Sequence, residues 1–250
     1  TPLYSSAASD VYKRQVEYRV ATSGTWTTFN DGVSTSTSAT VTGLTAGNEY
    51  EFRVRARNVI GNSQPSLVSP IVDSLPLAPS ISSVVAGSEQ VTVNWNAPSH
   101  LGSGSLTGLE YIVTAYDSNG NDAGTCSPTT GQRTCVVTGL DNGKTYTFKV
   151  AAVTTVGTSA ESAPSSPATP VSVPSAPANV VAVTSGSNMT VTFDAPADNG
   201  GSAITSYVVT SSPTGATCTV GANATTYTCT GLAAGTNYTY TVKAVNAKGD

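Results

Sequence analysis

One twelve-residue pattern occurs three times in this chain of 250 residues. It reads Gly-Leu-x-x-Gly-x-x-Tyr-x-aromatic-x-Val and spans residues 43–54, 139–150 and 231–242. Its glycines are typical of a turn, and apolar side chains at every second position after the tyrosine are typical of a strand with one buried face. The same turn and strand are therefore expected three times, and this repeat constrains the fold more than any other feature.

Two sets of markers give the same repeat length. The tyrosines of the pattern are 96 and 92 residues apart, at Tyr50, Tyr146 and Tyr238. A second set lies 93 and 96 residues apart, at Tyr18, Tyr111 and Tyr207. A unit of this length is that of one small β domain and is far longer than a solenoid repeat. The chain is therefore predicted to be all-β, with three copies of one domain.

The second strand of the later copies completes the pattern. Residues 91–98 (VTVNWNAP) and 189–196 (MTVTFDAP) alternate apolar with polar side chains and stop at Ala-Pro, where the missing N–H ends the pairing. Together with the tyrosine pattern, these strands resemble the fibronectin type III domain, an immunoglobulin-like β-sandwich of seven strands. The resemblance implies a core aromatic at Trp95 and Phe193. It also implies three tyrosine corners, formed by Leu44 and Tyr50, Leu140 and Tyr146, and Leu232 and Tyr238.

Part of the amino-acid sequence of the third copy is similar to bacterial members of this family. Residues 198–207 (DNGGSAITSY) resemble the fibronectin type III repeats of secreted actinobacterial proteins. Two positions depart from the family pattern: Phe193 stands for the tryptophan, and the corner proline is absent from all three copies. Both departures keep what the fold needs, because an aromatic side chain still fills the core and the glycine still permits the turn.

The copies are expected to be unequal in extent. Residues 16–73 form a partial copy that lacks the first two strands, residues 74–175 a complete copy, and residues 176–250 a copy that lacks its last strand. In the first copy a strand is expected at 38–42. Final strands of the first two copies are expected at 66–71 and 166–171. Short proline-containing linkers at 74–79 and 170–177 predict a repeated, semi-rigid geometry between copies.

The first fifteen residues are interpreted separately from the repeats. Residues 5–15 (SSAASDVYKRQ) match the translation of a transposase adapter used in sequencing libraries, and residues 1–4 fit the adjoining primer. Residues 1–15 are therefore predicted to be laboratory sequence and are left out of the fold argument. The alternative is a native disordered leader.

The four cysteines fall as one pair in each of the two later copies: Cys126 with Cys135, and Cys218 with Cys229. Neither pair has the Cys-x-x-Cys spacing of a zinc or redox site. An even number at like positions predicts two local disulfides and an oxidising, extracellular or cell-surface setting. The alternative is four buried thiols in a cytosolic protein.

Four other features could mark functional sites, and the first three have an ordinary structural interpretation. Arg53, Arg55 and Arg57 point to one face of their strand and are predicted to pair across the sheet with Glu17 and Glu51 rather than to bind an anion. His100 is expected in an exposed loop. Asp194, Asp198 and Asn199 could hold calcium, but Asx turns with the following glycines are favoured. Tyr227 is the one aromatic residue expected to be exposed in a loop, where it could contact a glycan.

No catalytic, cofactor or metal site is predicted. The net charge of −4 and the low share of charged residues, 10%, argue against nucleic acid as a partner. No apolar run approaches the length of a membrane span.

The favoured function is that of non-catalytic extracellular spacer or interaction modules of a larger secreted or cell-surface protein, with adhesion as one such role. Any partner would be an unknown protein or glycan at the cell surface. The alternative is a set of accessory modules of a secreted polysaccharide-degrading enzyme, and a dedicated glycan-binding module ranks third.

Overall fold

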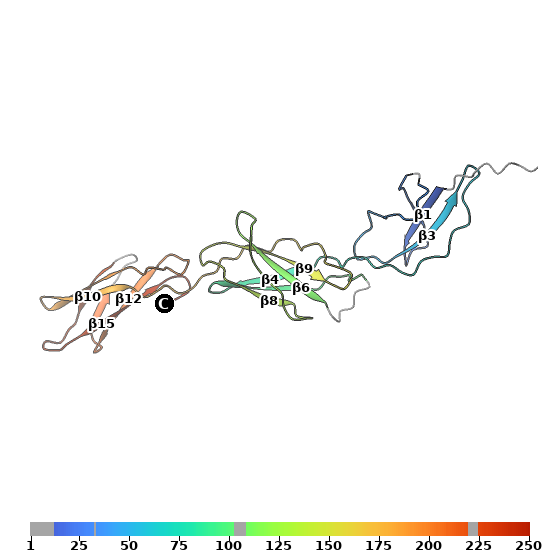
Figure 1. Cartoon of the computed structure of the whole chain (residues 1–250). Coiled ribbons are helices and arrows are strands. Elements are labelled where there is room, and N and C mark those ends of the chain that lie inside the picture. The colour runs from blue at the N-terminus through green and yellow to red at the C-terminus, as the bar shows by residue number, and fades with distance from the viewer. Residues whose placement is uncertain (1–12, 33, 103–108, 220–224) are drawn as a thin grey trace, which may run out of the picture.

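The computed structural model describes residues 13–32, 34–102, 109–219 and 225–250. These residues form strands and loops in three successive bodies, here called the first, second and third modules (Figure 1). None of the described residues belongs to a helix, so none belongs to a helix long and apolar enough to cross a membrane. The predicted all-β fold in three copies is confirmed.

The first module contains one three-stranded sheet in the order β2-β1-β3. Its strands are β1 (Lys13–Val20), β2 (Thr27–Phe29) and β3 (Tyr50–Arg57). β1 pairs with β3 from Lys13, opposite Arg57, to Val20, opposite Tyr50, so residues 13–15 take part in the sheet. The origin of residues 1–15 stays a prediction. The strand expected at 38–42 is absent from the described residues, because no other strand of this module is placed to pair with it.

The second module is a sandwich of two antiparallel sheets. One has the order β4-β5-β8 and the other β7-β6-β9. The strands are β4 (Ser80–Ala86), β5 (Gln90–Asn96), β6 (Glu110–Tyr116), β7 (Asp122–Cys126), β8 (Thr134–Thr138) and β9 (Thr147–Val153). Alternate side chains of both sheets meet in one core, where the Trp95 and Tyr111 rings pack edge to face with their centroids 5.1 Å apart.

The third module distributes equivalent strands differently between its sheets. β10 (Ala178–Ser185), β11 (Asn188–Asp194), β14 (Thr226–Thr230) and β13 (Thr217–Thr219) form one sheet, and β12 (Ser206–Ser212) and β15 (Thr239–Val245) form the other. Phe193 packs against the rings of Tyr207 and Tyr227 at 4.9 and 5.5 Å. A second core forms around these three rings.

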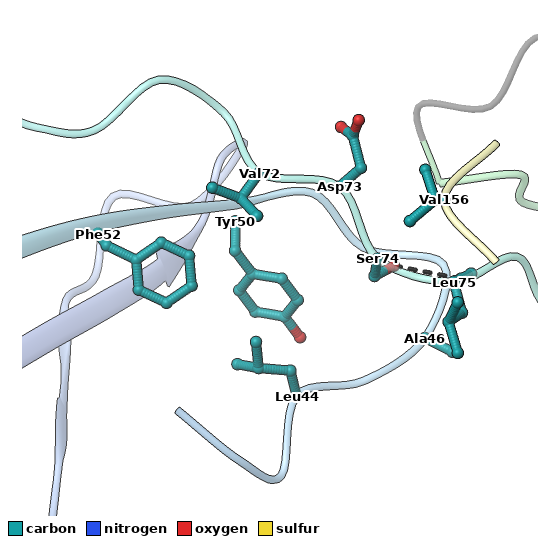
Figure 2. Close-up of a pocket in the computed structure, with 9 residues that line it drawn as sticks. All are labelled: Leu44, Ala46, Tyr50, Phe52, Val72, Asp73, Ser74, Leu75 and Val156. Atoms are coloured by element: carbon teal, nitrogen blue, oxygen red, sulfur yellow. Dashed lines mark hydrogen bonds between the residues drawn. The ribbon is translucent and has the colours of Figure 1, made fainter. Parts of the chain in front are cut away.

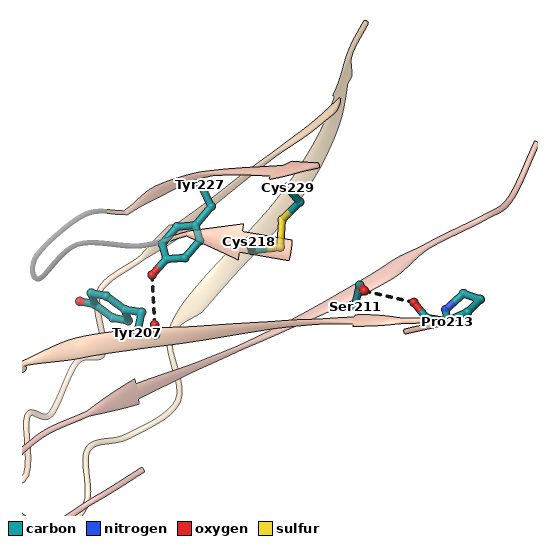
Figure 3. The surroundings of a disulfide bond; sticks show 6 residues. All are labelled: Tyr207, Ser211, Pro213, Cys218, Tyr227 and Cys229. Carbon is teal, nitrogen blue, oxygen red and sulfur yellow. Dashed lines mark hydrogen bonds between the residues drawn. A yellow bond between two sulfur atoms is a disulfide. The ribbon is translucent and has the colours of Figure 1, made fainter. Parts of the chain in front are cut away.

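Both predicted disulfides are present, Cys126–Cys135 and Cys218–Cys229. The first links β7 to β8 and so joins the two sheets of the second module. The second links β13 to β14, which are neighbours in one sheet with the two cysteines opposite each other (Figure 3). Cysteine pairs at like positions of the repeat therefore tie together two sheets in the second module and two strands of one sheet in the third.

Replacing Cys218 and Cys229 together with serine is expected to lower the free energy of unfolding of the third module by about 2–3 kcal/mol, because the bridge closes a short loop and restricts the unfolded chain. Hydrogen exchange of the third-module amides in urea measures this loss. The matched double variant at Cys126 and Cys135 should instead act on the second module. Free-thiol titration of the wild-type chain in denaturant should find no reactive thiol, and two thiols per molecule would contradict one of the bridges.

One face of the first-module sheet is left uncovered, as the exposure of equivalent residues on β3 and β9 shows. Phe148, Val150 and Ala152 of β9 are all 0% exposed, whereas Val54 of β3 is 42% exposed. The other two β3 counterparts are also more accessible than those of β9, with Phe52 half-buried and Ala56 exposed. The first module has no second sheet among the described residues to cover this face. The prediction that the first module lacks the first two strands of the fold agrees with this difference in exposure between β3 and β9, and it stays a prediction.

The prediction of final strands at 66–71 and 166–171 is wrong, because neither segment forms a regular strand. Residues 63–72 and 159–168, here called the serine-triplet segments, instead run along the outer edges of β3 and β9 with a serine at every third position. They contact the strand mainly through these serines and join it by an isolated bridge only at Val72 and Ala168. Side chains of these segments do not alternate with a period of two, because every three segment residues lie alongside two strand residues.

Tyr227 is buried, contrary to the prediction that it is an exposed loop aromatic. It lies on β14 with 1% of its surface exposed, and its Oη donates to the Tyr207 carbonyl oxygen at 3.2 Å (Figure 3). Burial raises the pKa of this phenol from 10.0 to about 12. The ring is therefore part of the core and offers no surface to a glycan.

This pKa predicts an alkaline weakening of the third module. The folded state favours the neutral phenol, so its contribution is complete below pH 10 and is lost as the pH rises towards 12. Following the unfolding of the third module between these values, with near-ultraviolet absorbance for the phenolate, measures the effect. A Tyr227→Phe variant should show a shallower loss over the same interval. Equal slopes in the two proteins would contradict the assignment.

Candidate functional site at the joints between modules

The two linkers hold their neighbouring modules through backbone hydrogen bonds. At the first joint, the Gly47 N–H of the first tyrosine corner donates to the Leu75 carbonyl at 2.9 Å, and the Leu77 N–H donates to the His100 carbonyl at 3.0 Å. Pro76 between them is fully buried. The linker is thus bonded to the module before it and to the module after it.

A hollow of about 290 Å³ lies on the first-module side of this joint (Figure 2). Leu44, Tyr50 and Phe52 line it from the first module, and Val156 reaches it from the second. Leu75 of the linker lies between them and packs over Gly157, where an added Cβ would come within 2.7 Å of the leucine Cδ2. The hollow is mostly apolar, so it is a packing defect of the joint rather than a site with catalytic groups.

The second joint repeats the arrangement with more bonds. The Gly143 N–H donates to the Pro170 carbonyl at 2.8 Å, as Gly47 does to Leu75. Further along the linker, the Ser172 N–H donates to the Gly200 carbonyl and the Ser175 N–H to the Asp198 carbonyl, both at 2.9 Å. The corner, the linker and the loop that follows the second strand of the next module therefore form one bonded unit.

One side chain, Asn246, joins the linker to the third module. Its Nδ2 donates to the carbonyl oxygens of Ser172 and Asn199, each at 2.8 Å, and the residue is 4% exposed. From the other side, the Asn142 Nδ2 donates to the Ser172 Oγ at 3.1 Å. Ser172 is thus held by one asparagine from each module.

Glycine is required where the backbones meet. Gly102 and Gly200 occupy equivalent positions at the two joints, and an added Cβ would lie 2.2 Å from the carbonyl oxygen of Ser74 in one case and of Ser172 in the other. At Gly201 it would lie 2.2 Å from the Gly143 nitrogen of the preceding module. All three glycines have a positive φ. Because these contacts are backbone to backbone, no side-chain movement can relieve a larger residue.

The three corner tyrosines hold equivalent turns, and the first two of these turns lie at the joints. Tyr50, Tyr146 and Tyr238 each accept a backbone N–H through their Oη, at 2.9, 3.1 and 3.0 Å from Thr45, Asp141 and Ala233. Leu140 is buried, and Leu44 and Leu232 are half-buried. Since Gly47 and Gly143 lie in these turns, the corner bonds also fix the position of the joint donors.

The acidic loop of the third module contributes to the second joint through Asx turns. The Gly200 N–H bonds to the Asp198 Oδ1 at 2.8 Å and the Gly201 N–H to the Asn199 Oδ1 at 2.9 Å, as predicted. Asp194 lies apart and accepts from the Asn179 Nδ2. The described residues contain no group of three or more potential metal ligands.

Two of the three arginines on the exposed face of β3, Arg53 and Arg55, form ion pairs as predicted, whereas Arg57 forms none with the described residues. Glu17 pairs with both Arg53 and Arg55, while Glu51 pairs with Arg19 rather than with the arginines of its own strand. Trp26 lies between two of these cations, with the Arg19 and Arg53 guanidinium carbons 4.7 and 4.1 Å from its ring centroid. Burial would raise the Glu17 pKa, but hydrogen bonds and charge from the two arginines lower it below its ordinary value.

His100 is exposed, as predicted, and its carbonyl oxygen accepts the Leu77 N–H at the first joint. Asn246, Ser172 and the paired glycines were not predicted as site residues. The signal for them was present in the repeat: Ser74 and Ser172 are 98 residues apart, as are Gly102 and Gly200. The equal spacings mark these residues as equivalent in successive copies, and the structure shows that each glycine meets its serine.

Comparison with known proteins agrees with this architecture. The family model described as the fibronectin type III domain matches residues 4–72, 77–168 and 175–250. The chain belongs to the fibronectin type III family. Its modules are fibronectin type III modules of a kind found in proteins with several domains, and the tandem arrangement is established.

Three relatives show how widely such modules occur. Exoglucanase B of Cellulomonas fimi is 32% identical over 88% of this chain and 21% of its own length. Human myomesin-2 is 32% identical over 58% of the chain and 10% of its own length, and a Kelch domain-containing protein of Saccharolobus solfataricus is 41% identical over 34% and 12%. The chain spans about a fifth or less of the length of these relatives.

Proposed function

We propose that the three fibronectin type III modules act as a non-catalytic spacer in a larger secreted or cell-surface protein of bacterial origin. The repeated joint carries this proposal. Each linker is bonded to both neighbouring modules, and equivalent glycines allow the same close approach twice. A spacer holds two other parts of a protein at a set distance, which requires joints that do not swing freely.

The two disulfides support the extracellular setting. Expression in an oxidising and in a reducing compartment separates this from a cytosolic role. The chain should need the oxidising compartment to reach full stability. Equal stability and yield in both would argue against it.

Residual dipolar couplings test the spacer directly. Couplings from the second and third modules should fit one alignment tensor with the orientation seen in the structure, because the joint bonds hold the modules together. Two different tensors would show a flexible joint and would contradict the spacer role.

A second function is favoured by one observation, the similarity to Exoglucanase B along 88% of the chain. Under this proposal the modules are accessory parts of a secreted polysaccharide-degrading enzyme. The gene sequence on both sides of this chain distinguishes the two functions. A glycoside hydrolase domain next to the modules supports the accessory role, and further modules with a surface anchor support the spacer role in adhesion or display.

A further inference from the structure

The outer strands of the second module are β4 and β8 in one sheet and β7 and β9 in the other. At one side of the sandwich, the Cys126–Cys135 bridge joins β7 to β8. At the other side, the serine-triplet segment covers the edge of β9, where the N–H groups of Ser159, Ser162 and Ser165 donate to strand carbonyls at 2.8 to 2.9 Å. Among the described residues, only β4 is left without a bonded neighbour along its outer edge.

The outer edge of β4 carries unpaired backbone groups. The Gly87 N–H donates to the Gln90 carbonyl at 2.8 Å and closes the hairpin between β4 and β5. Hydrogen-bonded and non-hydrogen-bonded pairs alternate along antiparallel strands, so Val85 bonds to β5, while Val84 and Ala86 point their N–H and C=O groups away from it. No backbone group of the described residues bonds to these two residues from outside the sheet.

One half of β4 lacks the features that usually keep an exposed edge from pairing. Residues 79–88 (PSISSVVAGS) contain no charged side chain, and their proline stands before the strand. A bulge between Ile81 and Ser83 interrupts the first half of the strand. The half from Ser83 to Ala86 is regular and uncharged, so this half can accept another strand.

An apolar side chain is exposed at this half of the edge. Val85 is 59% exposed on the outer face of the sheet, beside Thr92 of β5, and Val136 of β8 follows in the same row. Val84 and Ala86 point to the other face and pack against the core. On that side a hollow of about 530 Å³ lies between β4 and the serine-triplet segment. A strand added to β4 would therefore cover Val85 on one face and the hollow on the other.

This half-strand is complementary to a second copy of itself. When two copies of β4 run antiparallel with Val85 opposite Val85, each Val84 lies opposite an Ala86 of the other copy. Both members of such a pair point their backbone groups outward, so each pair can exchange two N–H···O bonds. The two exposed valines then face each other as a close, non-hydrogen-bonded pair. Neither strand brings a charge to the contact, so no like-charge pair opposes it.

We propose that the second modules of two copies of this chain pair through β4 and join their three-stranded sheets into one continuous sheet. The two-fold axis passes between the two Val85 residues, and the two β4 strands run in opposite directions. The contact consists of backbone bonds and two covered valines, so it belongs to the class of small, weak interfaces. It holds two copies side by side at their second modules.

Sedimentation equilibrium of the full chain, at concentrations up to about 1 mM, measures this pairing. Val85→Lys should raise the dissociation constant of the dimer at least about tenfold, because two ammonium groups would lie opposite each other. Val136→Lys is the matched control. It places the same charge on the same face of the sheet but away from the edge of β4, so the dissociation constant should not change. Unchanged Trp95 fluorescence in each variant shows that the second module is folded.

A mixture of Val85→Lys and Val85→Glu chains tests the register. Opposite charges would lie across the axis, so the mixture should form heterodimers although Val85→Lys alone stays monomeric. Amide exchange measured by nuclear magnetic resonance locates the contact: the Val84 and Ala86 amides should exchange more slowly as the concentration rises, and the Val85 amide, already bonded to β5, should not change.

Three results would overturn the proposal. The first is a wild-type chain that stays monomeric over the whole concentration range. The second is a dimer that survives Val85→Lys, or one that protects the amides of β10 in place of those of β4, since either result assigns the contact to another surface. The third is a mixture of the lysine and glutamate variants that stays monomeric, which would contradict the facing valines.

Discussion

Replacing Phe148 with alanine is expected to lower the free energy of unfolding of the second module by about 3–5 kcal/mol. The side chain is 0% exposed in a core closed by two sheets, so its loss leaves a cavity that the surrounding strands cannot fill. Urea unfolding followed by the fluorescence of Trp95, which lies in the same core, measures the change. The chain has only one other tryptophan, Trp26 of the first module.

The equivalent change in the first module provides the control. Phe52 occupies the same position of the repeat but is only half-buried, so Phe52→Ala should cost the first module about 1–2 kcal/mol. Trp26 fluorescence reports this loss. Similar losses in the two modules would show that the open face of the first module is covered in solution, contrary to the structure.

Replacing Gly201 with alanine is expected to separate the second and third modules without unfolding either. The new Cβ would lie 2.2 Å from the Gly143 nitrogen, and the backbones of both residues are held by hydrogen bonds. Residual dipolar couplings should then require separate alignment tensors for the two modules. The intrinsic cost of the left-handed backbone at φ 79° adds about 1–2 kcal/mol to the third module alone.

Gly235→Ala is the matched control for the joint. Gly235 has nearly the same φ, 76°, and a Cβ added there would meet nothing within 4 Å. This variant should carry the same backbone cost and keep one common tensor. If Gly201→Ala also kept a common tensor, close glycine packing would not be what holds the joint.

The cysteine pairs and the tyrosine corners show what the sequence could predict. Each depends on residues close in the chain: Tyr50, Tyr146 and Tyr238 bond to backbone five residues earlier, and the cysteines of each pair are 9 and 11 residues apart. For the same reason, period-two alternation located the second strands of the later copies at residues 91–98 and 189–196, where the structure has β5 and β11. Alternation reports which side of a strand is buried, and that property is local.

Features that depend on a neighbouring segment could not be predicted in this way. The serine-triplet segments were predicted as strands, because nothing in their own sequence shows that serine oxygens complete the edge of β3 or β9. Tyr227 was assigned to an exposed loop, because its burial depends on Phe193 and Tyr207 from two other strands.

The sequence by itself determined that this protein is a row of three fibronectin type III modules with local disulfides, since repeat length, alternation and cysteine spacing are properties of contiguous residues. Only the tertiary structure decided how the modules meet and which strands each cysteine pair ties together. These depend on contacts between residues far apart in the chain, such as Asn246 with Ser172 and Gly201 with Gly143. Their geometry follows from how whole sheets pack, so no local pattern encodes it.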